Sequence, residues 1–209
     1  MPASEDYHEA LWEAVPEGLE PVDFARRGGF LLGHVRAGER VLDMGCGEGR
    51  FAAALARVGA CPVGIDVAAE PLRRARERHP ELDLRQMTAE GAWPLEDASF
   101  DAVWAGEVIE HVADTAGWLS EARRVLRSGG SLLLSTPDHG RLRMLRWALA
   151  PRAFEAHFDP RADHLRFYTR RTLTELLEDF GFQDVEVRRA GGPPGARRAL
   201  LASARRSRF

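Results

Sequence analysis

A short glycine-rich segment between an apolar strand and an apolar helix constrains this chain more than any other feature. The segment covers residues 40–50, RVLDMGCGEGR, and begins with a buried-strand pattern. Gly45, Gly47 and Gly49 then turn the backbone into the helix. Glycines at such a corner permit positive φ and let a ligand approach the bare backbone, and the amides at the following helix start carry partial positive charge. This order of elements is typical of a site for a nucleotide-like cofactor.

The residues around the loop indicate which cofactor it could hold. A phosphate-binding loop of the GxxxxGK[ST] type is excluded because the chain contains no lysine. The dinucleotide pattern GxGxxG has Arg50 in place of its third glycine, and Asp43 beside the loop would repel a pyrophosphate. A carboxylate at that place suits a cofactor with an ammonium or sulfonium group, as in S-adenosylmethionine. Asp66, about 20 residues further on, ends the next apolar strand, where an acid holds ribose hydroxyls. The alternative is a tight turn without a ligand.

Strand-like and helix-like segments alternate along most of the chain. This order indicates right-handed βαβ crossovers and therefore an α/β fold with a doubly wound, mostly parallel sheet. Near the end, a helix is followed by two strands that a Gly-Pro-rich, hairpin-like loop connects. We expect strands at 40–44, 62–66, 82–87, 100–105, 131–136, 182–189 and 198–204, and helices at 50–59, 69–79, 114–127 and 172–180.

The composition indicates one soluble domain. The 209 residues, 44% of them hydrophobic, suffice for a single sizeable core. The net charge is −3 and every basic residue is an arginine, which we attribute to genomic composition bias, so no DNA partner is expected. The two cysteines suggest no disulfide framework. Neither a leader peptide nor an apolar run long enough for a bilayer is recognisable, so we expect a cytoplasmic protein.

Five segments resemble the class I S-adenosylmethionine-dependent methyltransferases over nearly the whole chain. They are VLDMGCGEGR, VGIDVA, TAEGAWPLEDASFDAVWAGEVIEHV, RVLRSGGSLLLSTP and FYTRRTLTELLEDFGF. The resemblance implies a Rossmann-like sheet of seven strands that ends in an antiparallel strand. It also implies a single methyltransferase domain over 1–209, with an N-terminal helical cap at 1–36 and a substrate lid inserted at 137–170.

The same resemblance places the S-adenosylmethionine pocket. In this family the segment after the third strand lines the adenine, and the backbone after the fourth strand meets the methionine portion. Many relatives carry Asp where this chain has Thr88, whose hydroxyl can replace that acceptor. The cofactor-binding residues expected from the loop and the resemblance are Asp43, Gly45, Cys46, Gly47, Asp66, Val67, Thr88, Ala89, Glu90 and Gly106.

Glu107, Glu110 and His111 form an E-x-x-E-H pattern after the fourth strand. Positions i, i+3 and i+4 of a helix share one face, so the spacing predicts that the three side chains converge. Two carboxylates and an imidazole can hold a divalent cation: oxygen-rich ligation favours magnesium, and the imidazole leaves manganese, zinc and iron open. The pattern resembles the ubiquinone-biosynthesis O-methyltransferases, where a metal is implicated in placing or acidifying a phenol, and the small-RNA 3′-end methyltransferases. The alternative is a metal-free site in which His111 takes the acceptor proton, or a mere helix start.

Residues 137–170 form a long connection at the carboxyl end of the fifth strand, where open α/β sheets place their ligand crevice. Leucines at helical spacing among the arginines of residues 141–152 predict a basic amphipathic helix that Pro151 ends. The interpretations are a substrate lid, a surface that rests on anionic lipid, and a helix packed on its own domain. Among the histidines of this insertion, His164 is the first catalytic candidate, ahead of His139 and His157.

We therefore expect S-adenosylmethionine-dependent methyl transfer to a small-molecule hydroxyl, such as a phenol with a lipid tail. The catalytic candidates are His111, Glu107 and His164. The alternative acceptors are an RNA 3′-terminal 2′-hydroxyl and a small-molecule amine. A different class of function would be an NAD-dependent oxidoreductase or a cofactor-binding module without turnover. Peripheral membrane contact through 141–152 follows from the lipid interpretation, and the oligomeric state stays open.

Overall fold

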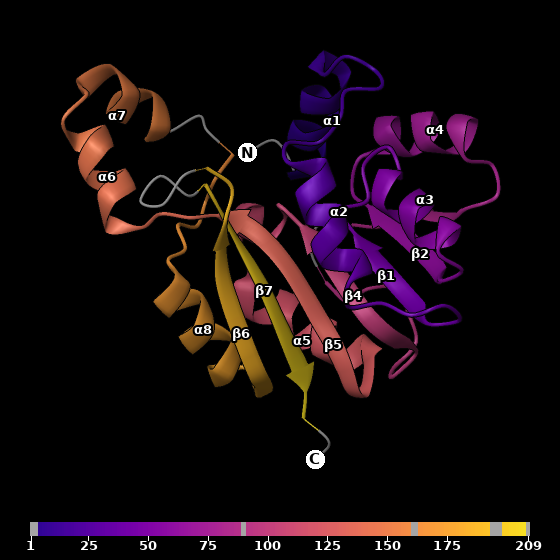
Figure 1. Ribbon diagram of the computed structural model, residues 1–209. Helices are drawn as coiled ribbons and strands as arrows, with labels where there is room; N and C mark the ends of the chain where they lie inside the picture. Colours follow the sequence, from indigo (N-terminus) through magenta and orange to yellow (C-terminus); the bar gives the residue numbers. More distant parts are fainter. Residues whose placement is uncertain (1–3, 89–90, 160–162, 193–197, 208–209) are drawn as a thin grey trace.

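A seven-stranded sheet runs through the middle of the molecule (Figure 1). The computed structural model describes residues 4–88, 91–159, 163–192 and 198–207. The strand order is β3-β2-β1-β4-β5-β7-β6, and β7 is antiparallel to both of its neighbours while the other pairs are parallel. This arrangement confirms the predicted doubly wound, mostly parallel α/β sheet. The strands are β1 (Arg40–Met44), β2 (Cys61–Asp66), β3 (Asp83–Gln86), β4 (Phe100–Gly106), β5 (Leu126–Pro137), β6 (Phe182–Ala190) and β7 (Ala199–Arg206).

Helices cover both faces of the sheet because successive residues of a buried strand point to opposite sides. Leu42 and Val103 belong to the core under α5 and α8, whereas Val41 and Trp104 belong to the core under α2 and α3. The helices are α1 (Ser4–Ala14), α2 (Phe24–Leu32), α3 (Arg50–Arg57), α4 (Ala69–Arg78), α5 (Thr115–Val125), α6 (Arg141–Ala148), α7 (Pro151–His157), α8 (Arg170–Asp179) and the 3₁₀ turn η1 (Ile109–His111).

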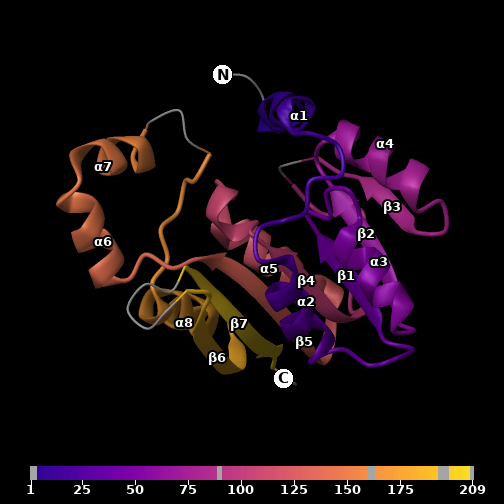
Figure 2. The same ribbon diagram turned by 45° about the horizontal axis from the view of Figure 1, so that its top comes forward.

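The strand order reverses between β1 and β4. From β1 the chain goes outward to β2 and β3, and it then returns to pair β4 with the other side of β1. Open α/β sheets bind their ligands outside the carboxyl ends of the strands at such a switch point. Figure 2 shows α1 on one side of this edge and the pair α6–α7 on the other.

The bounds of most elements differ from the predicted ones by one to five residues, and two differences have a clear physical cause. The helix predicted over 114–127 ends at Val125, because Leu126 already pairs with Phe100 and begins β5. The helix predicted through Glu107 is wrong, since the φ angle of this residue is +58° and a right-handed helix needs a negative φ. The turn η1 begins only at Ile109.

The insertion at 137–170 contains two short helices. The first, α6, ends at Ala148, before Pro151, as this proline predicts, and Pro151 then begins α7. Neither helix contains a buried residue, and Leu142, Leu145 and Leu149 are exposed to solvent. Within the described ranges, no helix is long and apolar enough to cross a membrane.

Candidate active site

The glycine loop lies at the switch point and requires its glycines for two separate reasons. Gly45, Gly47 and Gly49 have φ angles of +69°, +52° and +74°, which side chains with a Cβ rarely adopt. A Cβ at Gly45 would also lie 2.6 Å from Val108, and one at Gly47 would lie 2.9 Å from the indole of Trp12. The loop therefore combines a tight turn with close approach of other groups to its backbone.

Two buried carboxyl groups stand beside the loop and have different surroundings. Asp66 accepts hydrogen bonds from the backbone amides of Gly47 at 2.8 Å and Ala68 at 3.0 Å, so it braces the loop. Asp43 is buried, and its Oδ2 has no hydrogen-bond partner among the described residues. Burial, with a contribution from nearby Asp66, raises the pKa of Asp43 to about 7. An oxygen of this kind fits a cationic group of a ligand, such as the ammonium of S-adenosylmethionine.

A buried arginine, Arg27, lies at the same edge of the sheet, and the sequence motifs did not predict it as a site residue. Arg27 on α2 is 5% exposed, and its Nε has no partner among the described residues. Its guanidinium lies over the rings of Phe51 and Trp104, with Cζ 5.0 Å and 6.0 Å from the ring centroids. It also lies so close to Gly106 that a Cβ there would collide with it. Arg27 stands on the apolar face of α2, where a charged residue is unusual, and this position could have indicated a functional role.

Of the other predicted cofactor-binding residues, only some lie with an accessible group beside the loop. Cys46 turns its side chain into a small core with Leu72 and Leu84, so only its backbone remains for a ligand. Burial raises the pKa of its thiol well above the ordinary value. Val67 packs against the main core, and Gly106 ends β4 beside the loop. Thr88 is exposed, and the predicted residues Ala89 and Glu90 lie outside the described residues.

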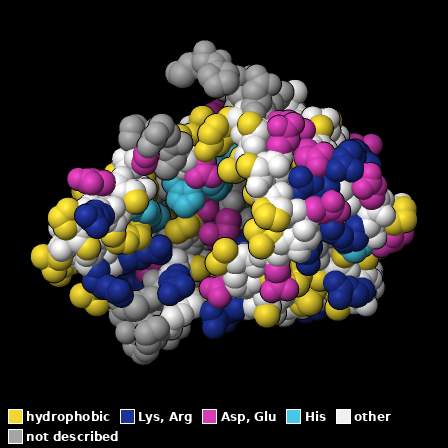
Figure 3. Space-filling model, turned by 90° about the horizontal axis from the view of Figure 1, so that it is seen from above, with side chains coloured by type: hydrophobic (Ala, Val, Ile, Leu, Met, Phe, Trp, Pro, Cys, Tyr) yellow, Lys and Arg dark blue, Asp and Glu magenta, His cyan; other side chains and the backbone are white. Residues whose placement is uncertain are grey.

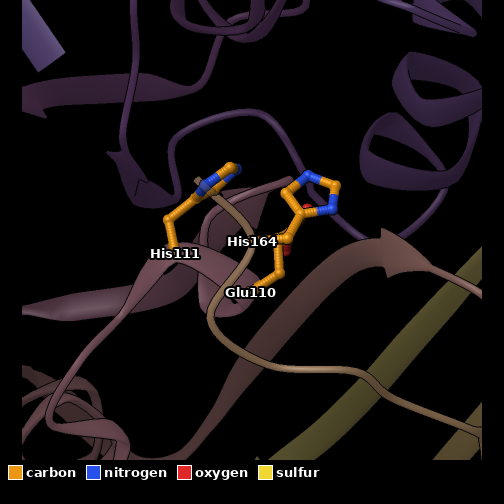
Figure 4. A group of neighbouring side chains, drawn as sticks. All are labelled: Glu110, His111 and His164. Carbon is orange, nitrogen blue, oxygen red and sulfur yellow. The ribbon is translucent and has the colours of Figure 1, made fainter. Parts of the chain in front are cut away.

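Three side chains converge next to the loop, but the set differs from the predicted one of Glu107, Glu110 and His111. Glu110, His111 and His164 each place one ligand atom within 4.8 Å of the others (Figure 4). Glu107 does not belong to this group: it accepts a hydrogen bond from Ser135 Oγ at 2.8 Å. The helical spacing argument was wrong here because Glu107 lies before the turn η1 with a left-handed backbone.

The carboxyl group of Glu110 is fully buried. Thr136 Oγ1 donates to its Oε2 at 2.9 Å, whereas its Oε1 has no partner among the described residues. Burial, reinforced by the negative charge of Glu107, raises the pKa of Glu110 to about 8. A buried oxygen without a partner at this place suits a donor from a ligand or a bound cation.

His111 is held in one orientation by the last part of the insertion, which returns to the sheet after α7. Its Nδ1 lies 3.1 Å from the carbonyl oxygen of Asp163 and 3.3 Å from the carboxylate of the same residue. With Nδ1 as the donor to that carbonyl, Nε2 keeps its lone pair. Burial lowers the pKa of His111, so the ring is neutral at pH 7 and can accept a proton.

The N-terminal helix closes the site from the side of α4 (Figure 2). Trp12 lies against Gly47, and the ring of His8 lies 6.2 Å from that of His111. The carboxylate of Glu9 accepts the backbone amides at the start of α4, at 2.6 Å and 3.0 Å. Glu48 of the glycine loop accepts the amide of Gly18 at 3.1 Å. Polar contacts thus connect α1 and the chain that follows it both to α4 and to the loop.

A hollow opens at the carboxyl edge, with histidine side chains on its wall and acidic ones at its floor (Figure 3). Arginines gather at the outer rim next to the insertion (Figure 3). Leu142, Leu145 and Leu149 of the insertion are exposed to 59%, 55% and 76%. Their side chains therefore do not pack on this domain.

Comparison with known proteins identifies the family. Residues 20–187 match the family described as "Methyltransferase domain". A Mycolicibacterium smegmatis protein named "Probable S-adenosylmethionine-dependent methyltransferase" is 39% identical over 73% of this chain and 55% of its own length. The ubiquinone biosynthesis O-methyltransferase of Dinoroseobacter shibae is 36% identical over 71% of this chain and 62% of its own length. This chain thus spans little more than half the length of these relatives.

Solved structures share the fold. Phosphoethanolamine N-methyltransferase 2 of Haemonchus contortus, in complex with S-adenosyl-L-methionine, superposes with a TM-score of 0.68 at 18% identity. The match covers 98% of this chain and 57% of the other. With the glycine loop, the buried Asp43 beside it and the seven-stranded sheet, these similarities show that the chain belongs to the class I S-adenosylmethionine-dependent methyltransferases.

Proposed function

We propose that this methyltransferase acts on the hydroxyl group of a small molecule. The observation that carries the proposal is the group of Glu110, His111 and His164, which combines an unpartnered buried carboxyl oxygen with two imidazoles at the carboxyl end of β4. S-adenosylmethionine supplies an electrophilic methyl group on its sulfonium. A phenolic hydroxyl has a pKa of about 10, so its oxygen becomes a good nucleophile only if a base takes its proton.

The residues of the chain have separate roles in this proposal. Asp43 and the amides of the glycine loop hold the cofactor, with Arg27 beside Gly106 as the buried cation for its carboxylate. Glu110 orients the acceptor hydroxyl, and Nε2 of His111 takes its proton. The Asp163 carbonyl keeps His111 in the required tautomer. Because the methyl group is already activated, holding the acceptor in line with it supplies most of the rate enhancement.

A divalent cation is the second candidate for the same three residues, favoured by the 4.8 Å spread of their ligand atoms. One carboxylate and two imidazoles suit manganese, iron or zinc better than the magnesium expected from two carboxylates. A cation there would supply positive charge that favours the deprotonated form of the acceptor hydroxyl. Dialysis against EDTA and elemental analysis decide between the cation and His111 as the means of deprotonation.

Acceptor profiling tests the proposal. The full chain is incubated with methyl-labelled cofactor and with phenols, polyprenyl phenols, small amines and short RNAs in parallel. We expect label in the phenols, since the relative from Dinoroseobacter shibae is named an O-methyltransferase of ubiquinone biosynthesis. Transfer only to amines or only to RNA 3′ ends would contradict the proposal while leaving the methyltransferase assignment intact.

We also propose that α6 and α7 contact an anionic membrane surface from which a lipid-tailed acceptor is taken. On α6 and just after it, the exposed Leu142, Leu145 and Leu149 alternate with arginines. Arg141, Arg146 and Arg152 form no hydrogen bond or ion pair among the described residues. Basic residues on an apolar helix favour binding at the interface of anionic lipids.

The change Leu145→Glu is expected to lower binding to vesicles of phosphatidylglycerol by about 10-fold, because an inserted leucine contributes roughly 1.5–3 kcal/mol. Co-sedimentation with phosphatidylglycerol and phosphatidylcholine vesicles measures the effect. Leu19→Glu is the matched control, since Leu19 is 60% exposed but lies far from α6 in the sequence and outside the insertion. Equal sedimentation of wild-type protein with both vesicle types would contradict the membrane contact.

A further inference from the structure

One buried histidine, just after the carboxyl end of β5, has no role in the proposed methyl transfer. His139 follows the end of β5, and its backbone amide donates to the carbonyl of Tyr168 at 2.8 Å. The same returning segment carries His164, and its Leu165 amide donates to the carbonyl of Glu110 at 2.8 Å. Tyr168 lies four residues after His164, and an extended chain advances about 3.3 Å per residue, so the part of the segment beside His139 lies at most about 13 Å from His164. His139 is thus one small molecule's length from the methyl-transfer site.

The ring of His139 is buried without hydrogen-bond partners. The residue is 4% exposed, and neither Nδ1 nor Nε2 has a partner among the described residues. The carbonyl of Pro137 lies near the ring but outside ordinary hydrogen-bond geometry. Leaving a buried polar group unpaired is unfavourable, and native proteins tolerate it mainly where a ligand or water completes the hydrogen bonds.

Aromatic rings surround this histidine. The ring of Phe167 stands edge-on at 5.0 Å, and that of His157 is tilted by 36° at 5.3 Å between centroids. Trp147 stacks on His157 at 3.6 Å, and the guanidinium of Arg143 covers the other side of the cluster, 4.6 Å from Trp147. Aromatic groups pack with their ring centroids 4.5–7 Å apart. The faces and edges of this aromatic cluster therefore suit contact with a further flat ring.

The charges near His139 select against a cationic ligand. In addition to burial, His157, Arg143 and His164 lower its pKa, and each of them carries or can take up a positive charge. Burial, together with these groups, lowers the pKa of His139 to about 4, so its ring is neutral at pH 7. A neutral imidazole has one N–H donor, which a carbonyl or ether oxygen can accept.

We propose that the His139 ring donates a hydrogen bond to an uncharged oxygen at the far end of a planar aromatic acceptor whose reacting hydroxyl lies at Glu110 and His111. The inference rests on the proposed function and adds the substrate class: aromatic hydroxyl compounds with a second, uncharged oxygen opposite the methylated one. Trp147, His157 and Phe167 would cover the ring of such a molecule.

Two phenols of similar shape test the inference. 4-Hydroxyacetophenone has the second oxygen, and 4-isopropylphenol lacks it. Calorimetry on the full chain, saturated with S-adenosylhomocysteine, is expected to show about 10-fold tighter binding of the ketone to the wild-type protein, the effect of one hydrogen bond that would otherwise be missing. In His139→Phe the two phenols should bind equally, with unchanged affinity for S-adenosylhomocysteine. His34→Phe is the matched control, because Nδ1 of His34 is already bonded to the carbonyl of Phe30 at 2.8 Å.

The outcomes are distinct. Equal binding of both phenols to the wild-type protein, or a preference that survives in His139→Phe, would overturn the inference. Binding of S-adenosylhomocysteine without binding of either phenol would overturn it as well. Absence of S-adenosylhomocysteine binding would instead contradict the use of this cofactor. The thermal midpoint of His139→Phe should not fall, since the change removes an unpaired buried polar group. A lower midpoint with the preference retained would assign His139 a purely structural role.

Discussion

The change Asp43→Ala is expected to weaken S-adenosylmethionine binding by about 100-fold, since it leaves the ammonium of the cofactor buried without a charged partner. Isothermal titration calorimetry with S-adenosylmethionine and its demethylated product measures the loss. Asp83→Asn is the matched control, because Asp83 lies on the edge strand β3 with its side chain 46% exposed. Unchanged affinity in Asp43→Ala would contradict the position of the cofactor given above.

The same residue predicts how cofactor affinity depends on pH. The pKa of Asp43 is about 7 in the unliganded protein, and only the ionised carboxylate attracts an ammonium group. Affinity should therefore fall about tenfold per pH unit as the pH is lowered below about 7. In Asp43→Asn the profile should be flat in this range. The unliganded Asn variant should also be at least as stable as the wild type at pH 8, because burying an unpaired carboxylate is unfavourable.

Replacement of His111 by glutamine is expected to lower kcat/KM by roughly 100- to 1000-fold, the usual contribution of a positioned general base. Affinity for S-adenosylhomocysteine should not change, because in the proposed function His111 contacts the acceptor hydroxyl and not the cofactor. His34→Gln is the matched control, since His34 is exposed after the end of α2 and its Nδ1 is bonded to the carbonyl of Phe30 at 2.8 Å. Rates are measured with the best acceptor from the profiling experiment.

Glu110→Gln separates the two ways in which this group can work. The buried carboxyl has a pKa of about 8 in the unliganded protein, so a neutral amide of the same shape should retain partial activity if Glu110 only orients the acceptor. If Glu110 instead holds a cation, the change should abolish activity and remove the metal from elemental analysis. Activity that survives EDTA would contradict the metal interpretation, and activity lost in EDTA and restored by a divalent ion would contradict His111 as an unaided base.

The strands and the glycine loop could be predicted from the sequence because their signals are local. Apolar runs of strand length, glycines at a corner and acids at strand ends all come from neighbouring residues, and the β–α alternation restricts the topology to a doubly wound sheet. The prediction failed at Glu107 for the same reason. Helical spacing is a local rule, whereas the left-handed backbone of Glu107 accompanies its contact with Ser135 on another strand.

The sequence by itself determined the fold class, through the alternation of strands and helices along most of the chain. Residues between Arg40 and Asp66 predicted a glycine loop for S-adenosylmethionine. Only the tertiary structure decided which side chains complete the site. Trp12 reaches Gly47, and His164 joins Glu110 and His111 in place of Glu107. These contacts join segments far apart in the chain, and they depend on how α1 and the last part of the insertion, after α7, pack over the sheet edge. No residue pattern within one element encodes such packing, because it is a property of several elements together.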